Sequence, residues 1–156
     1  MTLSELKVNF PSATEDTWHQ HSNGGGWVQN TATVANAAWV GPDAQVSGDA
    51  WVWGDAEVSG TACVYGNAVV LDNALVLDNA CVWGKARVSG NALVYGNARV
   101  LGDAEVSGHA RVSGDARVSG NAQVFGCANV SGNASVYGDA RVAGNAKVSG
   151  DAVISE

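Results

Sequence analysis

One hydrophobic pattern covers most of the chain: every sixth residue from Ala32 to Ala152 is alanine, without a break. Valine stands two residues after each alanine, except that Ile154 takes the last of these positions. Glycine stands four residues after alanine in 16 of 21 repeats, and Asp or Asn usually follows it. Residues two apart share one face of an extended segment, and Gly-Asp or Gly-Asn tolerates the positive φ of a corner. The hexad Ala-x-Val-x-Gly-Asp/Asn therefore predicts a short strand followed by a turn.

This repeat predicts a solenoid built from triangular coils. Strands this short cannot form successive hairpins without other turn residues, but they can turn a corner every six residues. Three hexads make an 18-residue coil, and 21 hexads make about seven coils, whose strands stack ~4.8 Å apart. We expect an all-β parallel helix, shaped as a triangular prism, over residues 31–156. Val should fill its interior, and Ala should sit where the wall bends and space is tight.

The N-terminal segment, residues 1–30, lacks the repeat and is expected to form a short cap over the first coil. Ser12 to Glu15 fits a capping box, which predicts a short helix from Ser12 through Trp18. Residues 21–26 are expected to form a loop. A cap is expected because an exposed strand edge invites pairing with other chains.

The run from Gly96 to Ala122, GNARVLGDAEVSGHARVSGDARVSGNA, resembles the hexapeptide-repeat proteins of the left-handed parallel β-helix superfamily. The resemblance spans residues 31–156, about four fifths of the chain. Within the superfamily, the chain most resembles uncharacterised bacterial and prophage-encoded proteins with near-perfect repeats. In those proteins a Gly-Gly-Trp-Val segment, like residues 25–28 here, often precedes the repeats. The resemblance implies a left-handed winding and a trimer as the commonest assembly. Many members place Gly directly after the aliphatic residue, whereas here Gly comes one residue later.

Outward-facing positions can be read as columns, because residues 18 apart should be neighbours on one face of the prism. Between Trp51 and Leu101 these positions are apolar more often than the surface of a soluble monomer requires. The expected oligomer-interface residues are Trp39, Trp51, Trp53, Tyr65, Leu71, Leu75, Leu77, Trp83, Leu93, Tyr95 and Leu101. They predict a homo-oligomer, most simply a trimer, and a ligand or partner site is the alternative.

Composition narrows the class of protein. The chain is 46% hydrophobic with a net charge of −7, which excludes a disordered chain and disfavours binding to duplex nucleic acid. No apolar run reaches the ~18 residues of a membrane span, and no signal peptide is recognisable, so a cytoplasmic protein without a membrane partner is expected. The three cysteines are expected to be free thiols, with Cys63 and Cys81 stacked as an apolar pair.

Charge is distributed unevenly along the repeat. Residues 31–84 carry six acidic residues and no basic ones, whereas residues 85–147 carry seven basic residues against four acidic ones. Guanidinium groups offer bidentate donors to phosphate, and aromatic rings can stack a base. The candidate ligand-binding residues are Arg87, Arg99, Arg111, Arg117, Arg141, Tyr95, Phe125 and Tyr137. Arg99 and Arg117 should stack on one face, and salt bridging to Asp103 and Glu105 is the alternative to an anion site.

Catalytic chemistry has only weak candidates. His109 and Cys127 should stack at one corner, as a nucleophile and base or as half of a zinc site. Two ordinary corner substitutions are the simpler interpretation, so we expect no catalytic residue, no metal and no cofactor. The superfamily's carbonic anhydrases use three His around zinc, a spacing absent here. Its acyltransferases insert a loop with a catalytic His, whereas no insertion breaks the hexad frame from 32 to 156.

Three hypotheses for function follow. The favoured one is a non-enzymatic structural or binding protein, a rigid oligomeric β-helix scaffold, phage or prophage encoded by resemblance and active in the host cytoplasm in that case. The second is a sponge that binds an anionic small molecule or signalling nucleotide in Arg-lined pockets between subunits. The third is a hexapeptide acyltransferase or a γ-carbonic-anhydrase-like enzyme.

Overall fold

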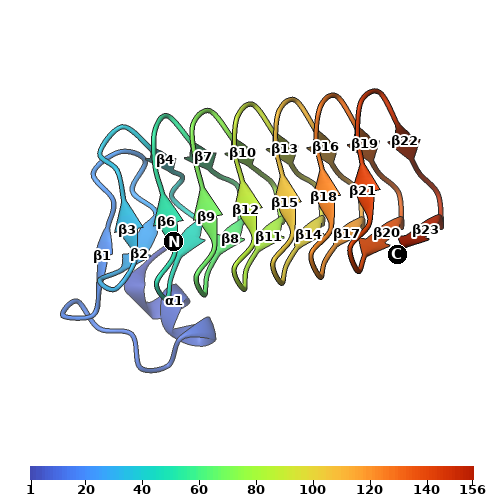
Figure 1. The fold of residues 1–156 in the computed structure, drawn as a ribbon. Coiled ribbons are helices and arrows are strands. Elements are labelled where there is room, and N and C mark those ends of the chain that lie inside the picture. The colour runs from blue at the N-terminus through green and yellow to red at the C-terminus, as the bar shows by residue number, and fades with distance from the viewer.

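The computed structural model describes residues 1–156, most of which form a prism wound as a β-solenoid, with a helix beside its N-terminal end (Figure 1). Each coil contributes one short strand to each of three sheets, and seven coils stack along the prism axis. Strands that pair in parallel are 18 residues apart in sequence, as in Gln45 with Cys63 or Arg99 with Arg117. The predicted all-β parallel solenoid of about seven coils is therefore confirmed. The hand of its winding stays an expectation from the resemblance.

The three sheets are named here by their strands. Sheet A contains β1 (Trp18–Gln20), β2 (Trp27–Gln29), β5 (Gln45–Val46), β8 (Cys63–Val64), β11 (Cys81–Val82), β14 (Arg99–Val100), β17 (Arg117–Val118), β20 (Ser135–Tyr137) and β23 (Val153–Ser155). Sheet B contains β3 (Thr33–Val34), β6 (Trp51–Val52), β9 (Val69–Val70), β12 (Arg87–Val88), β15 (Glu105–Val106), β18 (Gln123–Val124) and β21 (Arg141–Val142). Sheet C contains β4 (Trp39–Val40), β7 (Glu57–Val58), β10 (Leu75–Val76), β13 (Leu93–Val94), β16 (Arg111–Val112), β19 (Asn129–Val130) and β22 (Lys147–Val148). All pairings are parallel except that of β1 with β2.

The core consists almost entirely of the hexad Ala and Val side chains. Every hexad Ala from Ala38 to Ala140 and every hexad Val from Val40 to Val136 is fully buried, at 0% exposure. They belong to one hydrophobic cluster that runs the length of the prism. Burying one Val side chain stabilises the fold by roughly 1.5–3 kcal/mol, so the repeated Val column is the main source of stability. The interior positions predicted from the sequence are confirmed.

Hydrogen bonds join neighbouring coils at the strands and at the corners alike. Arg99 N donates to Ala116 O at 2.9 Å, and Asn97 N donates to Gly114 O at 2.8 Å. The corner glycines of the repeat have φ between 65° and 75°, the left-handed region in which a residue without Cβ is unstrained. The Gly-Asp/Asn corner is therefore confirmed. Two hexads turn the same corner without glycine, at Asp72 (φ 63°) and Asp78 (φ 60°).

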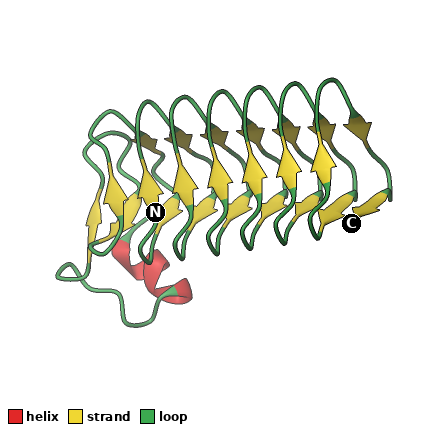
Figure 2. Ribbon diagram, in the orientation of Figure 1, coloured by secondary structure: helices red, strands yellow, loops and turns green.

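The single helix lies elsewhere than expected. Helix α1 spans Leu3–Asn9, and Figure 2 shows it beside the prism near the first coils. Thr2 caps it: Glu5 N donates to Thr2 Oγ1 at 3.2 Å, and Thr2 N donates to Glu5 Oε2 at 2.6 Å. The predicted helix from Ser12 through Trp18 is wrong. Both segments fit the capping-box pattern, but Trp18 pairs with Gln29 in the antiparallel β1–β2 pair and is held in a strand.

The segment before the repeats makes backbone or side-chain hydrogen bonds on or beside all three sheets at the first coil. Strand β1 covers the edge of β2 in sheet A. The expected loop at residues 21–26 is confirmed, and Asn23 O accepts a hydrogen bond from Val40 N of sheet C at 3.0 Å. The His21 ring reaches Ala35 O, beside sheet B, at 3.1 Å.

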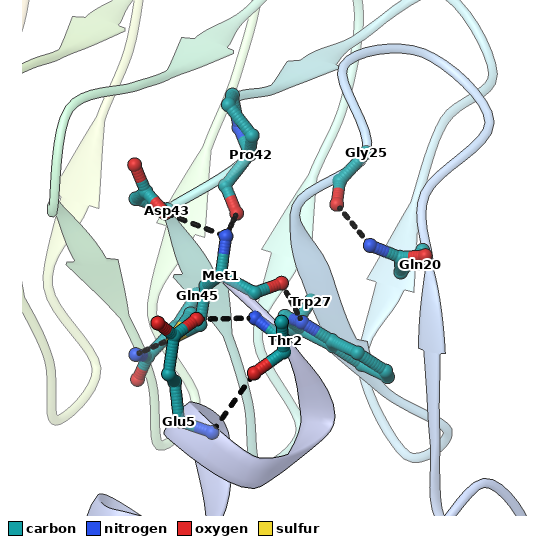
Figure 3. A network of polar contacts seen from close by, with 9 residues as sticks. All are labelled: Met1, Thr2, Glu5, Gln20, Gly25, Trp27, Pro42, Asp43 and Gln45. Atoms are coloured by element: carbon teal, nitrogen blue, oxygen red, sulfur yellow. Dashed lines mark hydrogen bonds and ion pairs between the residues drawn. The ribbon is translucent and has the colours of Figure 1, made fainter.

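A polar network fastens α1 to the prism (Figure 3). The amino group of Met1 lies 2.7 Å from Asp43 Oδ1 and donates to Pro42 O at 3.1 Å. The Trp27 indole donates to Met1 O at 3.0 Å. Beneath this network, Leu6 packs with Trp18 and Trp27 in a second, smaller hydrophobic cluster. The helix is thus held by both polar and apolar contacts.

Helix α1, the chain's only helix, is too short and too polar to cross a lipid bilayer.

Candidate functional site

Sheet A carries the most varied chemistry of the three faces. Its outward column follows the predicted register. In order along the prism it contains Gln45, Cys63, Cys81, Arg99, Arg117 and Ser135. All three cavities of the molecule border this sheet. The sequence predicted the cysteine pair and the arginine pair separately, and the structure makes them one continuous column. Sheet A is therefore the candidate face for binding a small solute.

The two cysteines of this column are direct partners on adjacent strands. Both are free and half-buried, as expected from the sequence. A hydrogen bond between the two thiols, followed by burial, raises the pKa of Cys63 far above its usual range. The same hydrogen bond, assisted by the guanidinium of Arg99, lowers the pKa of Cys81 to about 7. The two thiols thus shift each other's pKa in opposite directions.

A hollow of about 450 Å³ opens over these thiols, and α1 provides part of its wall through Asn9 and Phe10. Next to the thiols, the rings of Tyr65 and Trp83 stack at 5.6 Å with an interplanar angle of 4°. Burial, reinforced by the neighbouring cysteines, raises the pKa of Tyr65. The hollow is thus partly apolar and gives a small solute access to two sulfur atoms.

The next two rungs of the column form a polar groove. Arg99 and Arg117 are in register on β14 and β17 and border a hollow of about 290 Å³ with Asn97, Asp115 and Ser135. Neither guanidinium is paired with a carboxylate, and the only ion pair in the chain is that of Met1 with Asp43. No ion pair joins Arg99 or Arg117 to Asp103 or Glu105, and Glu105 is instead the direct strand partner of Arg87 on sheet B.

The acidic residue that borders this groove, Asp115, accepts a hydrogen bond from Asn97, a contact that the sequence analysis did not predict. Along this corner Asn79 Nδ2 donates to Asn97 Oδ1 at 3.1 Å, and Asn97 Nδ2 donates to Asp115 Oδ1 at 3.0 Å. Asp115 thus accepts an amide hydrogen bond instead of an ion pair. The signal that could have found this ladder is the recurrence of Asn or Asp at one corner every 18 residues.

The other predicted anion-site residues do not converge on this groove within one chain. Arg87 and Arg141 lie on sheet B, and Arg111 lies on sheet C. The Arg141 guanidinium stacks over the Phe125 ring, with its central carbon 5.2 Å from the ring centre. The strand positions put Tyr95 beside sheet C and Tyr137 on sheet A. The structure therefore brings together Arg99 and Arg117 but not the full predicted set.

The predicted apolar band is present on the surface, and its largest members are the most exposed. Trp39 is 43% exposed on sheet C, and Trp51 and Trp53 are 53% and 52% exposed on and beside β6 of sheet B. The remaining members are half-buried or exposed; Leu71 lies beside sheet B, Leu75, Leu77, Leu93 and Tyr95 on or beside sheet C, and Tyr65, Trp83 and Leu101 on the sheet A face. Sheets B and C together thus present a broad apolar surface.

His109 and Cys127 lie at the corner between sheets B and C, in the order that the sequence predicted. Both are exposed, and their backbone amides donate to Gly126 O and Gly144 O in the usual corner pattern. Nowhere do three His, Cys, Asp or Glu side chains gather as a metal site. This corner therefore offers no third ligand to complete a zinc site.

Comparison with known proteins supports the repeat architecture. A family model described as the YdcK beta solenoid repeat matches residues 86–102, 104–120 and 110–126, which lie in the middle coils of the prism. No curated protein and no solved structure matches the chain. Over these central coils, the chain is therefore similar to the YdcK type of β-solenoid repeat.

Proposed function

We propose that this protein is a non-enzymatic scaffold that associates with copies of itself through sheets B and C. The observation that carries the proposal is the exposure of Trp51 and Trp53, each more than half open to solvent at one rung of the prism. Val69 pairs with Trp51 in the next coil, and Leu71 follows it, so the tryptophans extend an apolar surface. Tryptophan is the residue most enriched among those that carry the energy of protein interfaces.

The arrangement of apolar faces favours a trimer. Sheets B and C meet at the corner of Asp55, and in the next coil both present apolar side chains, Val69 and Leu71 on sheet B and Leu75 and Leu77 on sheet C. A prism with two apolar faces is suited to two neighbours, as in a closed ring of three, whereas a two-fold dimer uses one patch. Sheet A is left free in this arrangement, because α1 and its hollows occupy that face. We therefore place Tyr65, Trp83 and Leu101 outside the seam.

The uninterrupted coil frame supports a role in binding rather than catalysis. The corners between successive strands keep the same short length from β3 to β23, so no inserted loop shapes a substrate pocket. With the resemblance to left-handed hexapeptide-repeat proteins of prophages, this favours a rigid cytoplasmic scaffold, in the host cytoplasm if a phage encodes it. An enzyme of the acyltransferase or carbonic anhydrase type is the less favoured alternative.

Light scattering coupled to gel filtration tests the assembly. The wild-type protein should have about three times the 15.9 kDa mass of one chain. The double variant Trp51→Ser, Trp53→Ser should be monomeric, because it removes the apolar centre of the seam. The matched control is Tyr137→Ser on sheet A, where the side chain is 44% exposed; it should leave the mass unchanged. A monomeric wild-type protein would remove the proposal.

A second candidate function is the binding of an anionic small molecule. The observation that favours it is the groove in which Arg99 and Arg117 lie in register without a carboxylate partner. Two guanidinium groups at adjacent rungs repel each other, and an anion between them relieves the repulsion.

Thermal unfolding with inorganic phosphate and with nucleotides tests this candidate. An anion that binds should raise the unfolding temperature of the wild-type protein. The double variant Arg99→Gln, Arg117→Gln should lose that shift, and Arg111→Gln on sheet C should keep it. If none of these anions shifts the unfolding temperature, the anion site is wrong.

A further inference from the structure

The geometry of sheet A fixes how the two thiols face each other. Cys63 and Cys81 are direct partners on the adjacent parallel strands β8 and β11, and both side chains leave the sheet on its outer face. Side chains of in-register parallel partners run side by side at about the strand spacing, ~4.8 Å. Flanking backbone holds this spacing, since Cys63 N donates to Ala80 O at 3.0 Å and Cys81 N to Ala98 O at 3.0 Å.

This spacing suits a bridging metal ion better than a disulfide. A disulfide prefers Cβ atoms roughly 3.5–4.5 Å apart, so the stacked coils would have to be drawn together to form one. A zinc–thiolate bond is about 2.3 Å long, so two metal–sulfur bonds of that order placed end to end span ~4.6 Å, close to the ~4.8 Å spacing of the strands. A metal ion held in line between the sulfurs therefore fits the undistorted sheet.

The ligand set selects the class of ion. Zinc takes four ligands in structural sites, whereas no third His, Cys, Asp or Glu side chain joins the two cysteines. Soft thiolates select soft ions, and Cu(I) is the biological cation of that kind whose demands two sulfurs can meet. The hard cations Ca²⁺ and Mg²⁺ require oxygen ligands in larger numbers.

The surroundings suit the charge of such a complex. Two thiolates and one monovalent cation carry a net charge of −1. Arg99 is the direct partner of Cys81 on the next strand, so a positively charged side chain neighbours the complex. Phe10 and Tyr65 border the same hollow and limit the access of water, while the opening of about 450 Å³ admits an ion.

We propose that Cys63 and Cys81 form a two-coordinate site for a soft monovalent cation, with Cu(I) as its representative. Binding replaces both thiol protons by the metal: one Cu(I) enters, two sulfur–copper bonds form, and two protons leave to solvent. No electron is transferred, so the step needs no oxidant or reductant. The site goes beyond the proposed assembly, because the seam uses sheets B and C and these thiols lie on sheet A.

Anaerobic competition with a coloured Cu(I) chelator tests the site on the full chain. The reduced wild-type protein should withdraw one Cu(I) per chain from the chelator. Loss of one of only two ligands should weaken binding by about 100-fold or more, because even altered outer-shell groups cost 10–100-fold. Cys63→Ser and Cys81→Ser should each have this effect. Both variants are expected to fold, since Ser135 occupies the equivalent outward position of the same column.

The matched control is Cys127→Ser, which removes an exposed cysteine at a different corner and should leave Cu(I) binding unchanged. X-ray absorption at the copper edge should show two sulfur neighbours and no nitrogen or oxygen. The proposal is overturned if the wild-type protein takes no copper from the chelator or if binding depends on Cys127. It is also overturned if Zn²⁺ competes equally or if a Cys63–Cys81 disulfide forms in air as readily as in an unstrained pair.

Discussion

Asp72 Oδ2 accepts a hydrogen bond of 3.0 Å from Gly90 N, the corner residue of the next coil on the same edge. Asp72 occupies the corner position that glycine takes in most hexads, with φ 63°. Asp78 repeats the arrangement with Gly96, also at 3.0 Å. The left-handed conformation costs a residue with a Cβ roughly 1–2 kcal/mol, and the additional hydrogen bond offsets part of that cost. At these two corners the hydrogen bond of the carboxylate therefore offsets part of the strain that glycine avoids at the other corners.

Asp72→Ala should lower the free energy of unfolding by about 1–3 kcal/mol, because alanine keeps the left-handed strain and loses the hydrogen bond. Asp72→Gly should stay within about 0.5 kcal/mol of wild type, since it loses the bond but also the strain. Asp72→Asn, whose amide oxygen can still accept from Gly90 N, is the matched control. Urea unfolding measures all three. Equal losses for Ala and Gly would show that strain plays no part.

Gly96→Ala and Gly144→Ala should differ although both glycines have positive φ, 70° and 65°. A Cβ at Gly96 would lie 3.0 Å from Gly114 N of the next coil, whereas a Cβ at Gly144 would meet no atom within 4 Å. Gly144→Ala should cost about 1 kcal/mol from strain alone. Gly96→Ala should cost about 2–4 kcal/mol, because overpacking against backbone adds to that strain. Urea midpoints that shift equally would contradict the close stacking of the corners.

Arg117→Gln should stabilise the fold by roughly 0.2–1 kcal/mol at low salt, because it removes repulsion from Arg99 on the paired strand. The gain should vanish in 1 M salt, where screening acts over ~3 Å. Arg111→Gln changes the net charge equally but has Leu93 and Asn129 as its paired neighbours, so it is the control and should bring no gain. A loss of stability in Arg117→Gln at low salt would show that attraction to Asp115, which borders the same hollow, outweighs the repulsion from Arg99.

His21 should make the cap sensitive to acid. Burial, with a smaller contribution from His19, lowers the pKa of His21 below its ordinary 6.5. The unfolded chain therefore binds a proton at a higher pH than the folded chain, and stability rises with pH between the two pKa values. The contribution is complete above about pH 6.5 and is lost as the pH falls through the folded pKa.

Hydrogen exchange at the Val40 amide, which donates to Asn23 O in the cap loop, measures this effect. As the pH falls from 7 to 5, exchange at this amide should slow less than its intrinsic rate does, and this excess over the intrinsic dependence reports the loss of protection. In His21→Gln, which keeps an N–H donor for Ala35 O, the excess should disappear. The exposed His19, changed to Gln, is the control and should retain most of the excess. Identical profiles in wild type and His21→Gln would contradict the assignment.

The solenoid could be predicted from sequence because each rule in it is local and is repeated. Val100 is buried for the same reason as Val82 and Val118, and the period of 18 then places Cys63 beside Cys81. What could not be predicted depends on contacts made once. Two capping boxes compete in the first 20 residues, and only the pairing of Trp18 with Gln29 shows that the second is not used.

In the candidate site, too, some features follow from the repeat and others depend on contacts made only once. The stacking of Arg99 on Arg117 follows from the period, but the absence of ion pairs does not, because it depends on the side-chain ladder that engages Asp115. The wall that Phe10 adds to the thiol hollow depends on where α1 lies. A segment without the repeat contains no information on which face of the prism it will contact.

Hydroxyl-radical footprinting of the wild-type protein, above and below the concentration at which it dissociates, tests the central claim that sheets B and C associate. Trp39, Trp51 and Trp53 should lose reactivity in the assembled protein, because each is 43–53% exposed in the single chain. Tyr137, which is 44% exposed on sheet A, should react equally in both states. Unchanged reactivity of Trp51 and Trp53 on assembly, or protection of Tyr137 in their place, would contradict the proposed arrangement.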